Sequence, residues 1–146
     1  MQERVETLDE KKQLIAEFLR EQELAVVSSI WDGRPQAAVL VFSTKDDFEL
    51  IFGTFNTTRK YRNLKANPNT AVVIGWDDGV TVQYEGLAEE VGLGEFAEYQ
   101  TIHLKKNPGS ERYANLDGQC YFKVKPRWIR YTDINPDPEF TFELNF

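Results

Sequence analysis

The chain has 146 residues and a formal net charge of -7, with 24 acidic residues against 17 Lys and Arg. Its hydrophobic share of 41% and charged share of 28% are typical of one globular domain with a real core and exclude a disordered chain. The negative charge argues against general nucleic-acid binding and against docking to anionic membranes, and no apolar run is long enough for a membrane span.

The N-terminal segment predicts a cytoplasmic protein that begins with a helix. Residues 1–6 are charged and lack the apolar core of a signal peptide, and Cys120 is the only cysteine, so no intrachain disulfide framework is expected. Thr7 and Glu10 match a capping box, and apolar residues follow at helical spacing. Residues 8–22 are therefore predicted to form an amphipathic helix that packs on the domain.

Turn signals and β-branched runs then predict a meander of antiparallel strands. Asp32-Gly33 and residues 77–79 are hairpin turns, and Asn67-Pro68 ends a short helix. The predicted strands are 24–30, 36–43, 48–53, 70–76, 80–91 and a bent last strand over 121–131. Gly86 in mid-strand predicts a bulge or a close backbone approach. The apolar run 71–74 predicts that the fourth strand is covered on both faces.

The C-terminal third adds a second helix and a tail. Residues 95–106 are predicted to form an amphipathic helix that ends before Pro108. The tail, residues 133–146, alternates apolar and polar side chains near its end, which fits either an edge strand or a contact with a partner subunit. Together the elements predict a single mainly β domain over 1–146, with a six-stranded antiparallel barrel at about 23–132 and flanking helices.

The loop after the third strand is the best candidate site. Residues 53–64 give a strand end, a polar turn and a helix start, and the unpaired N–H groups of a helix start favour an anion. Thr57 or Thr58 is a candidate N-cap. Arg59 and Lys60 add positive charge beside the threonine hydroxyls, which suits a phosphate monoester.

The charge pattern singles out the same loop. Residues 50–76 include no Asp or Glu, although Arg59, Lys60, Arg62 and Lys65 fall within them and the chain is acidic elsewhere. A window that is kept free of carboxylates favours a bound phosphate. An ordinary solvated helix face with basic residues is the alternative interpretation, and the pattern leaves both open.

The sequence carries little acid-base machinery, and catalytic residues stay unassigned. His103 is the only histidine, there is no Walker or G-x-G-x-x-G loop, and the acid pairs lie at turns or strand ends, so no metal site is expected. An enzyme with this sequence would need a cofactor to carry the reaction. Among the aromatic residues that could line a flat pocket, Trp128 is the best candidate, because it lies at a predicted strand entrance.

Several short segments carry a family resemblance through their order and spacing. They are residues 24–29, Asp32-Gly33-Arg34-Pro35-Gln36, Gly53-Thr54 ahead of Thr58-Arg59-Lys60, Asn63-Leu64, Asn67-Pro68 and residues 85–88. In this order they resemble the FMN-binding split-barrel family, whose best-known member is pyridoxamine 5'-phosphate oxidase. The resemblance covers residues 23–91, and residues 126–131 are similar to the final strand of small members.

The resemblance implies a split barrel that forms a homodimer and holds FMN in a cleft between the subunits. It implies phosphate contacts from Arg59 and Lys60, helped by Thr58. It further implies that Gly53 and Thr54 lie along the ribityl chain and ring edge. The remaining implied cofactor contacts are the backbone at Val39, Leu40 and Val41, a polar contact near Thr81 and Gln83, and Trp128 from the partner subunit.

The implied function is an FMN-dependent oxidoreductase that passes electrons between a reduced nicotinamide and a small organic acceptor. The acidic, aromatic segment 137–142 stands where the oxidase proper has basic residues, so vitamin B6 is not the expected substrate. The alternatives are a non-catalytic flavin-binding or stress-related protein and, less favoured, a haem-binding or deazaflavin-binding member of the fold. A single histidine gives little support for haem, whereas FMN and a deazaflavin share a phosphate and a tricyclic ring.

Overall fold

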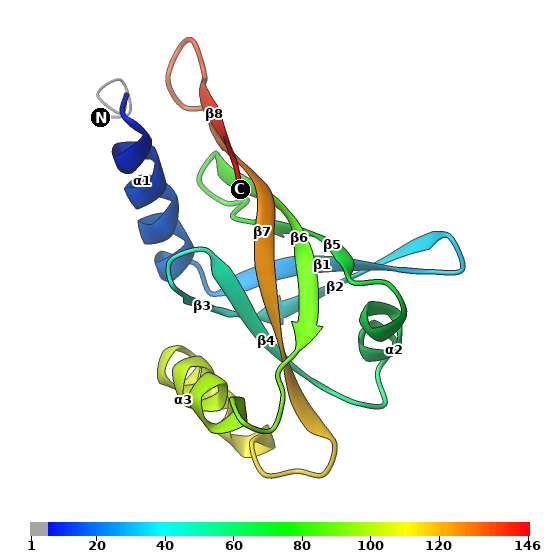
Figure 1. Cartoon of the computed structure of the whole chain (residues 1–146). Helices are drawn as coiled ribbons and strands as arrows, with labels where there is room; N and C mark the ends of the chain where they lie inside the picture. Colours follow the sequence, from blue (N-terminus) through cyan, green and yellow to red (C-terminus); the bar gives the residue numbers. More distant parts are fainter. Residues whose placement is uncertain (1–5) are drawn as a thin grey trace.

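Eight antiparallel strands curl into an open half-barrel in the computed structural model, which describes residues 6–146 (Figure 1). The first five residues, on which part of the prediction for the N-terminus rests, lie outside the described residues. The strands are β1 (Leu24–Trp31), β2 (Arg34–Val41), β3 (Ser43–Lys45), β4 (Glu49–Phe55), β5 (Asn69–Ile74), β6 (Val80–Glu90), β7 (Gln119–Asp133) and β8 (Phe140–Asn145).

In residues 6–146, three α-helices and one short 3-10 helix flank the sheet. They are α1 (Leu8–Glu21), α2 (Arg59–Ala66), α3 (Phe96–Lys106) and η2 (Pro108–Tyr113). The capping box at the start of α1 is confirmed, because the Thr7 hydroxyl accepts from the Glu10 N–H and the Glu10 carboxylate accepts from the Thr7 N–H. Between residues 6 and 146, no helix is long and apolar enough to cross a membrane.

The strand order is β2-β1-β5-β6-β7-β4-β3, with β8 paired to β7. The long strand β7 joins two parts of the sheet, because its first half pairs with β4, its second half pairs with β8, and β6 runs along both. The register shifts between Glu85 and Gly86, where a Cβ on Gly86 would lie only 2.3 Å from the Lys125 carbonyl oxygen. The predicted close backbone approach at Gly86 is therefore confirmed.

The main core lies inside the curl of the sheet and under α1. Ile15 and Leu19 of α1 pack with side chains from β1, β4, β5, β6 and β7, all of which are buried. A smaller cluster forms where α3 covers β4 and β7, around Tyr99 and Tyr121. Figure 1 shows the result: α1, α2 and α3 lie around the outside of the curled sheet, and the β1–β2 hairpin projects from it.

The mainly β, antiparallel fold with flanking helices is confirmed, but the strand count of six was too low, since residues 6–146 form eight strands. The sequence prediction placed residue 43 at the end of the second strand and residue 45 in the turn that follows it. Phe42 is buried, and this break in the ladder sends Ser43 across to pair with β4 as a separate strand. The tail forms β8, the edge strand that was one of its two predicted roles.

The prediction that β5 is covered on both faces was wrong, because only one face of β5 is covered by the described residues of its own chain. Thr70, Val72 and Ile74 are buried, but Ala71 is exposed and Val73 keeps 37% of its surface exposed. The apolar run reflects two different surfaces: an inner face in the core, and an outer face that no other part of the described chain covers.

Candidate functional site

The loop between β4 and α2 folds as a hydroxyl-lined helix start. Thr58 is the N-cap, since its side chain accepts from the Tyr61 N–H, so the choice between Thr57 and Thr58 is settled. The hydroxyl oxygens of Thr54 and Thr58 lie 2.8 Å apart. The loop therefore places two hydroxyls beside the first turn of a helix, where free N–H groups attract an anion.

Two of the four basic residues in the carboxylate-free window are already engaged. The Lys65 ammonium lies 2.8 Å from a carboxylate oxygen of Glu90, a residue from far along the sequence. The Arg62 guanidinium stacks 3.8 Å from the centre of the Trp31 ring and donates to the Asn63 side-chain oxygen. Neither side chain is free to hold a ligand at the loop without breaking these contacts.

The other two basic residues have no acid partner in the described residues. The Arg59 Nε donates to the Gln36 side-chain oxygen at 2.9 Å, which holds the exposed guanidinium beside β2. Lys60 is half-buried, and this burial lowers the pKa of its ammonium. A cation that is partly removed from water without a carboxylate beside it favours the binding of an anion.

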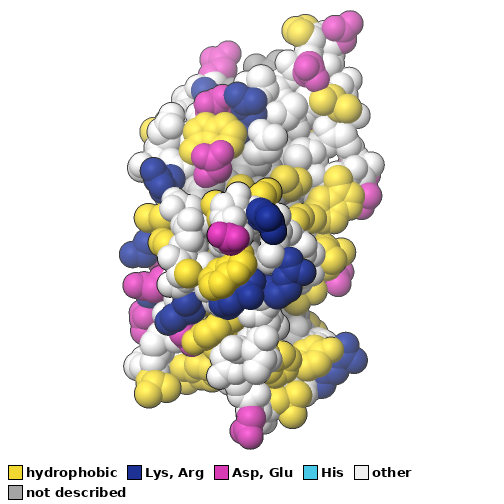
Figure 2. Space-filling view, turned by 90° about the vertical axis from the view of Figure 1, so that its right-hand side faces the viewer, with side chains coloured by type: hydrophobic (Ala, Val, Ile, Leu, Met, Phe, Trp, Pro, Cys, Tyr) yellow, Lys and Arg dark blue, Asp and Glu magenta, His cyan; other side chains and the backbone are white. Residues whose placement is uncertain are grey.

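Figure 2 views the side of the molecule on which Figure 1 places α2, and Lys and Arg side chains gather across the middle of this face. The concentration is local, because the chain as a whole is acidic. The positive potential at this face adds to the field of the helix start and would attract a phosphate group.

A polar network that the sequence did not predict links the start of α2 to β1 and β2. Asn63 is fully buried, and its amide donates both to the Ser29 hydroxyl at 3.0 Å and to the Gln36 side-chain oxygen at 2.8 Å. Gln36 in turn accepts from Arg59. The network ties α2 to β1 and β2, so the orientation of Arg59 depends on residues that are distant in sequence.

Two neighbouring hollows meet at Lys60. One, of about 390 Å³, is lined by Ser29, Gln36, Arg59 and Lys60 among others. The other, of about 470 Å³, also reaches Lys60, and we call it the flavin groove after the cofactor that the sequence resemblance predicts. Seven of the predicted site residues line the flavin groove: Val39, Leu40, Val41, Gly53, Thr54, Thr58 and Lys60. The fold thus brings β2, β4 and the start of α2 around one cavity.

The far end of the flavin groove is lined by residues that the sequence analysis missed, namely His103, Ser110, Tyr113, Gln119 and Tyr121. His103, Ser110 and Tyr113 come from α3 and η2, which cover this side of the sheet, whereas Gln119 and Tyr121 come from β7, which pairs with β4. Tyr113 also contacts Phe55 edge to face. Except for Lys60, the side chains that line the groove carry no charge at neutral pH, so it is suited to an uncharged aromatic ring system.

His103 is buried and neutral at physiological pH. Its exposed fraction is 2%, its Nδ1 lies 3.0 Å from the Ser43 hydroxyl, and its ring packs against Tyr121. Burial, with a smaller contribution from the nearby Lys106 charge, lowers the pKa of His103 to about 4. These contacts satisfy His103 as a residue of the core.

The buried histidine should make the fold sensitive to acid. The unfolded chain binds a proton at His103 near pH 6.5 and the folded chain only near pH 4, so stability falls as the pH drops through this range. Between pH 7 and pH 4.5 the free energy of unfolding should lose about 2–3 kcal/mol through this residue. Urea unfolding of the wild type and of His103→Gln at both pH values isolates this loss. An equal loss in both proteins would contradict it.

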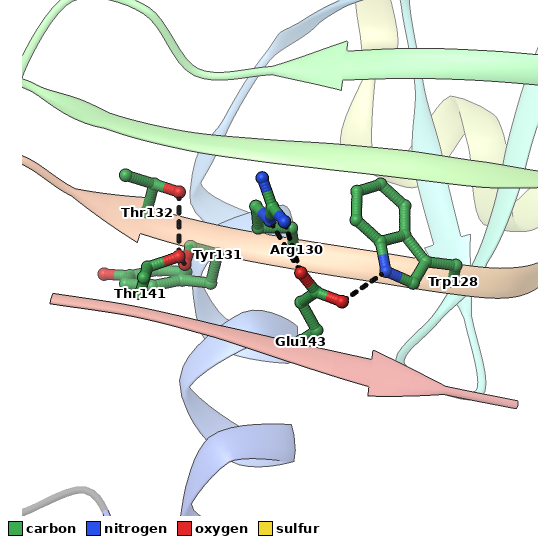
Figure 3. Close-up of polar contacts among 6 residues, drawn as sticks. All are labelled: Trp128, Arg130, Tyr131, Thr132, Thr141 and Glu143. Carbon is green, nitrogen blue, oxygen red and sulfur yellow. Dashed lines mark hydrogen bonds and ion pairs between the residues drawn. The ribbon is translucent and has the colours of Figure 1, made fainter.

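Trp128, Thr81 and Gln83 are not brought to the flavin groove of their own chain. They lie on β6 and β7, and Trp128 lines a separate hollow of about 450 Å³ with Ile30, Pro35 and Ala71. Figure 3 shows how β8 holds this region: the Trp128 indole N–H donates to Glu143 at 2.9 Å, and Arg130 pairs with the same carboxylate. The structure therefore separates these three residues from the loop between β4 and α2.

The outer face of β2, β1 and β5 is apolar and open. The register aligns Val39 with Val26 and Val26 with Val73 across the three strands. Val39 keeps 60% of its surface exposed, and Leu24 and Ile30 of β1 are also exposed. We call this surface, Leu24, Val26, Ile30, Val39 and Val73, the outer sheet face. Contiguous apolar exposure of this kind marks interaction surfaces.

Comparison with known proteins places the chain beside one enzyme family. The family model described as pyridoxamine 5'-phosphate oxidase matches residues 12–133. A pyridoxine/pyridoxamine 5'-phosphate oxidase from Burkholderia vietnamiensis is 31% identical over 135 residues, which cover 87% of this chain. The chain spans 63% of the length of that curated relative.

Solved structures share the fold at low sequence identity. General stress protein 26 from Bacillus anthracis has a TM-score of 0.72 at 22% identity, covering 92% of this chain and 98% of that one. A FAD-binding protein from Mesorhizobium loti has a TM-score of 0.67 at 15% identity, with 80% and 90% covered. A heme binding protein from Mycobacterium smegmatis has a TM-score of 0.75 at 14% identity, with 90% and 57% covered.

Proposed function

This chain belongs to the pyridoxamine 5'-phosphate oxidase family, and we propose that it is an FMN-dependent oxidoreductase that acts on a small organic substrate. The observation that carries the proposal is Lys60. Its half-buried ammonium has no carboxylate partner in the described residues, and it stands at a helix start beside two hydroxyls, at the junction of the two hollows. A phosphate that ends an otherwise uncharged ligand matches this arrangement.

Different residues around the flavin groove would hold different parts of the cofactor. Lys60, Arg59 and the Thr58 hydroxyl would neutralise and orient the phosphate. Strand β2 stands at one end of the sheet, so one of its edges has no strand partner in the described residues and leaves backbone groups free at Val39 to Val41. FMN, when bound, supplies one-electron and two-electron transfer, while these residues fix its position.

The proposal includes a homodimer that completes the site. Val39 and Val41 line the flavin groove, and Val39 also belongs to the exposed outer sheet face, so a single chain gives a flat ring only part of its enclosure. A second copy on the outer sheet face would bury the apolar row and bring its own β6 and β7 toward the groove. Trp128, which Glu143 holds in place, is the residue we expect the partner to contribute.

Flavin is favoured over haem by the state of His103. Haem iron needs an axial ligand, and the single histidine of the chain is almost fully buried, with one ring nitrogen already bonded to Ser43. The phosphate-seeking loop also has no role in that alternative. Vitamin B6 as the substrate is not part of the proposal, because the chain matches only part of the curated oxidase.

The visible spectrum of the purified protein tests the proposal. We expect a yellow protein with the absorbance bands of an oxidised flavin, and mass spectrometry of the released cofactor should identify FMN rather than FAD or a deazaflavin. Supply of NADH or NADPH with an organic acceptor should then give turnover above that of free FMN. A colourless protein that does not bind added FMN would overturn the proposal, and bound FMN without protein-dependent turnover would favour the non-catalytic flavin-binding alternative.

A further inference from the structure

Lys60 and Lys106 differ from the ion-paired lysines of the described chain in what surrounds their ammonium groups. Lys45, Lys65 and Lys123 each lie within about 3.1 Å of a glutamate oxygen, and these contacts raise the pKa of each. Lys60 and Lys106 have no carboxylate at ion-pair distance within residues 6–146, and burial lowers the pKa of both. The reasoning that assigns Lys60 to an anion therefore applies to Lys106 as well.

Lys106 ends α3 with its ammonium only partly satisfied. The Nζ donates to the Leu19 carbonyl oxygen at 3.1 Å and lies 3.8 Å from the centre of the Phe42 ring. An ammonium has three N–H donors, so one hydrogen bond leaves donors for another acceptor. Burial lowers the pKa of Lys106 to about 8, and Glu23 opposes this effect without reaching ion-pair distance, so the group is mostly cationic at neutral pH.

Lys106 borders a hollow of about 790 Å³. Its lining comes from the end of α1, the end of α3 and η2. Val41, Ser110 and Tyr113 line both this hollow and the flavin groove, so the two are neighbours that share a wall. We call the hollow the Lys106 arm, since a ligand that lies in it can extend to the groove.

The other cations that line the Lys106 arm, Arg20 and Arg112, already make contacts, and the carboxylates of the arm would repel an anion. The Arg20 guanidinium pairs with Asp47 at 3.1 Å, and the exposed Arg112 stacks on Tyr113. The carboxylates of Glu21 and Glu23 also line the arm. A dianionic phosphate would need more donors than one ammonium and would be repelled by these two acids. A single carboxylate group matches Lys106, the one cation of the arm that is partly buried and has no acid partner in the described residues.

We propose that the Lys106 arm is the substrate site and that Lys106 binds the carboxylate of a small organic acid. The apolar and aromatic part of this acid would lie against Val41 and Tyr113, at the wall shared with the flavin groove. The substrate role rests on the proposed function, whereas the binding of the acid depends only on the arm.

Benzoate and its neutral analogue benzamide are matched probes for the arm. Isothermal titration at pH 7 should show that the wild type binds benzoate at least about tenfold more tightly than benzamide, because only benzoate can pair with the ammonium. Lys106→Met should lose this preference, and Lys106→Arg should keep it. Lys105→Met is the control, since the neighbouring Lys105 is exposed and lines no described cavity, and it should bind as the wild type does.

The outcomes separate this inference from the proposed function. Titrations with and without added FMN test the arm by itself, and Lys106→Met should bind FMN as the wild type does. If benzoate binds through Lys106 but FMN does not bind, the anion site stands and the function fails. Equal binding of the two probes, or a preference that survives in Lys106→Met, would overturn the inference whatever the flavin result.

The pH dependence of the wild type gives a test that needs no variant to fold. The preference for benzoate should decline as the pH rises through about 8, where the ammonium loses its proton. The other ionisable groups around it are Glu23 and His103 nearby and Arg20, Glu21 and Arg112 in the arm. A preference that stays constant through this range would exclude Lys106 as the binding cation.

Discussion

Replacing Arg59 and Lys60 together by alanine should weaken FMN binding by about 3–6 kcal/mol, which raises Kd roughly 150-fold to 20,000-fold. The reason is that these two cations are the ones at the loop without an acid partner in the described residues, so a phosphate is their natural counterion. Lys60 should account for the larger part, because its ammonium is half-buried while Arg59 is exposed. Titration of FMN, followed by the quenching of its fluorescence, measures both single variants and the double variant.

Lys65→Ala is the matched control for this experiment. Lys65 is on the same helix and carries the same charge, but Glu90 already neutralises it. Its removal should change Kd less than about threefold, the scale of an exposed ion pair. Riboflavin, which lacks the phosphate, should bind the double variant and the wild type equally well. Unchanged FMN binding in the double variant would show that the phosphate lies elsewhere.

Val73→Glu should convert the proposed dimer into a monomer. Val73 is on the outer sheet face, and a second copy seated there would bury the new carboxylate without a partner. This costs at least about 3 kcal/mol and raises the dissociation constant of the dimer 100-fold or more. FMN should bind more weakly as well, although Val73 does not line the flavin groove, because the partner's contribution to the site is lost. Size-exclusion chromatography with light scattering gives the mass in solution.

Leu93→Glu controls for the general effect of exchanging an exposed apolar residue for an acid. Leu93 is 96% exposed between β6 and α3, away from the outer sheet face, so this variant should keep the mass and the FMN affinity of the wild type. A Val73→Glu protein that remains dimeric would place the interface on another surface. A wild type that is monomeric with FMN bound would remove the homodimer from the proposal.

Local chemistry allowed much of the fold to be predicted. The turn at Asp32-Gly33 was predicted from its residue types, and both residues adopt the positive φ angles that such a hairpin needs, 52° and 72°. The capping box of α1 and the N-cap at Thr58 likewise involve groups within four positions of each other. Interactions between residues this close in the chain can be recognised directly from the sequence.

The strand count and the faces of the strands were harder to predict, because they depend on partners that are distant in the chain. Residues 43–45 form a strand only because β4 lies beside them. The apolar run of β5 does not tell whether its second face meets a helix, another sheet or a second subunit. The same limit hid His103 and Tyr113, which reach the groove through the packing of α3 and η2, and Gln119, which reaches it through the pairing of β7 with β4.

The sequence by itself determined the loop that we propose as the phosphate site: the order of a strand end, threonines and two cations, in a window without acids. Only the tertiary structure decided which of the four cations in that window stay available. Glu90 comes from another strand to neutralise Lys65, Trp31 stacks on Arg62, and Gln36 holds Arg59 in place, while Lys60 receives no acid partner from the described chain. The physical reason is that charge along a sequence is a property of neighbours in the chain, whereas the field that a ligand meets is set by neighbours in space.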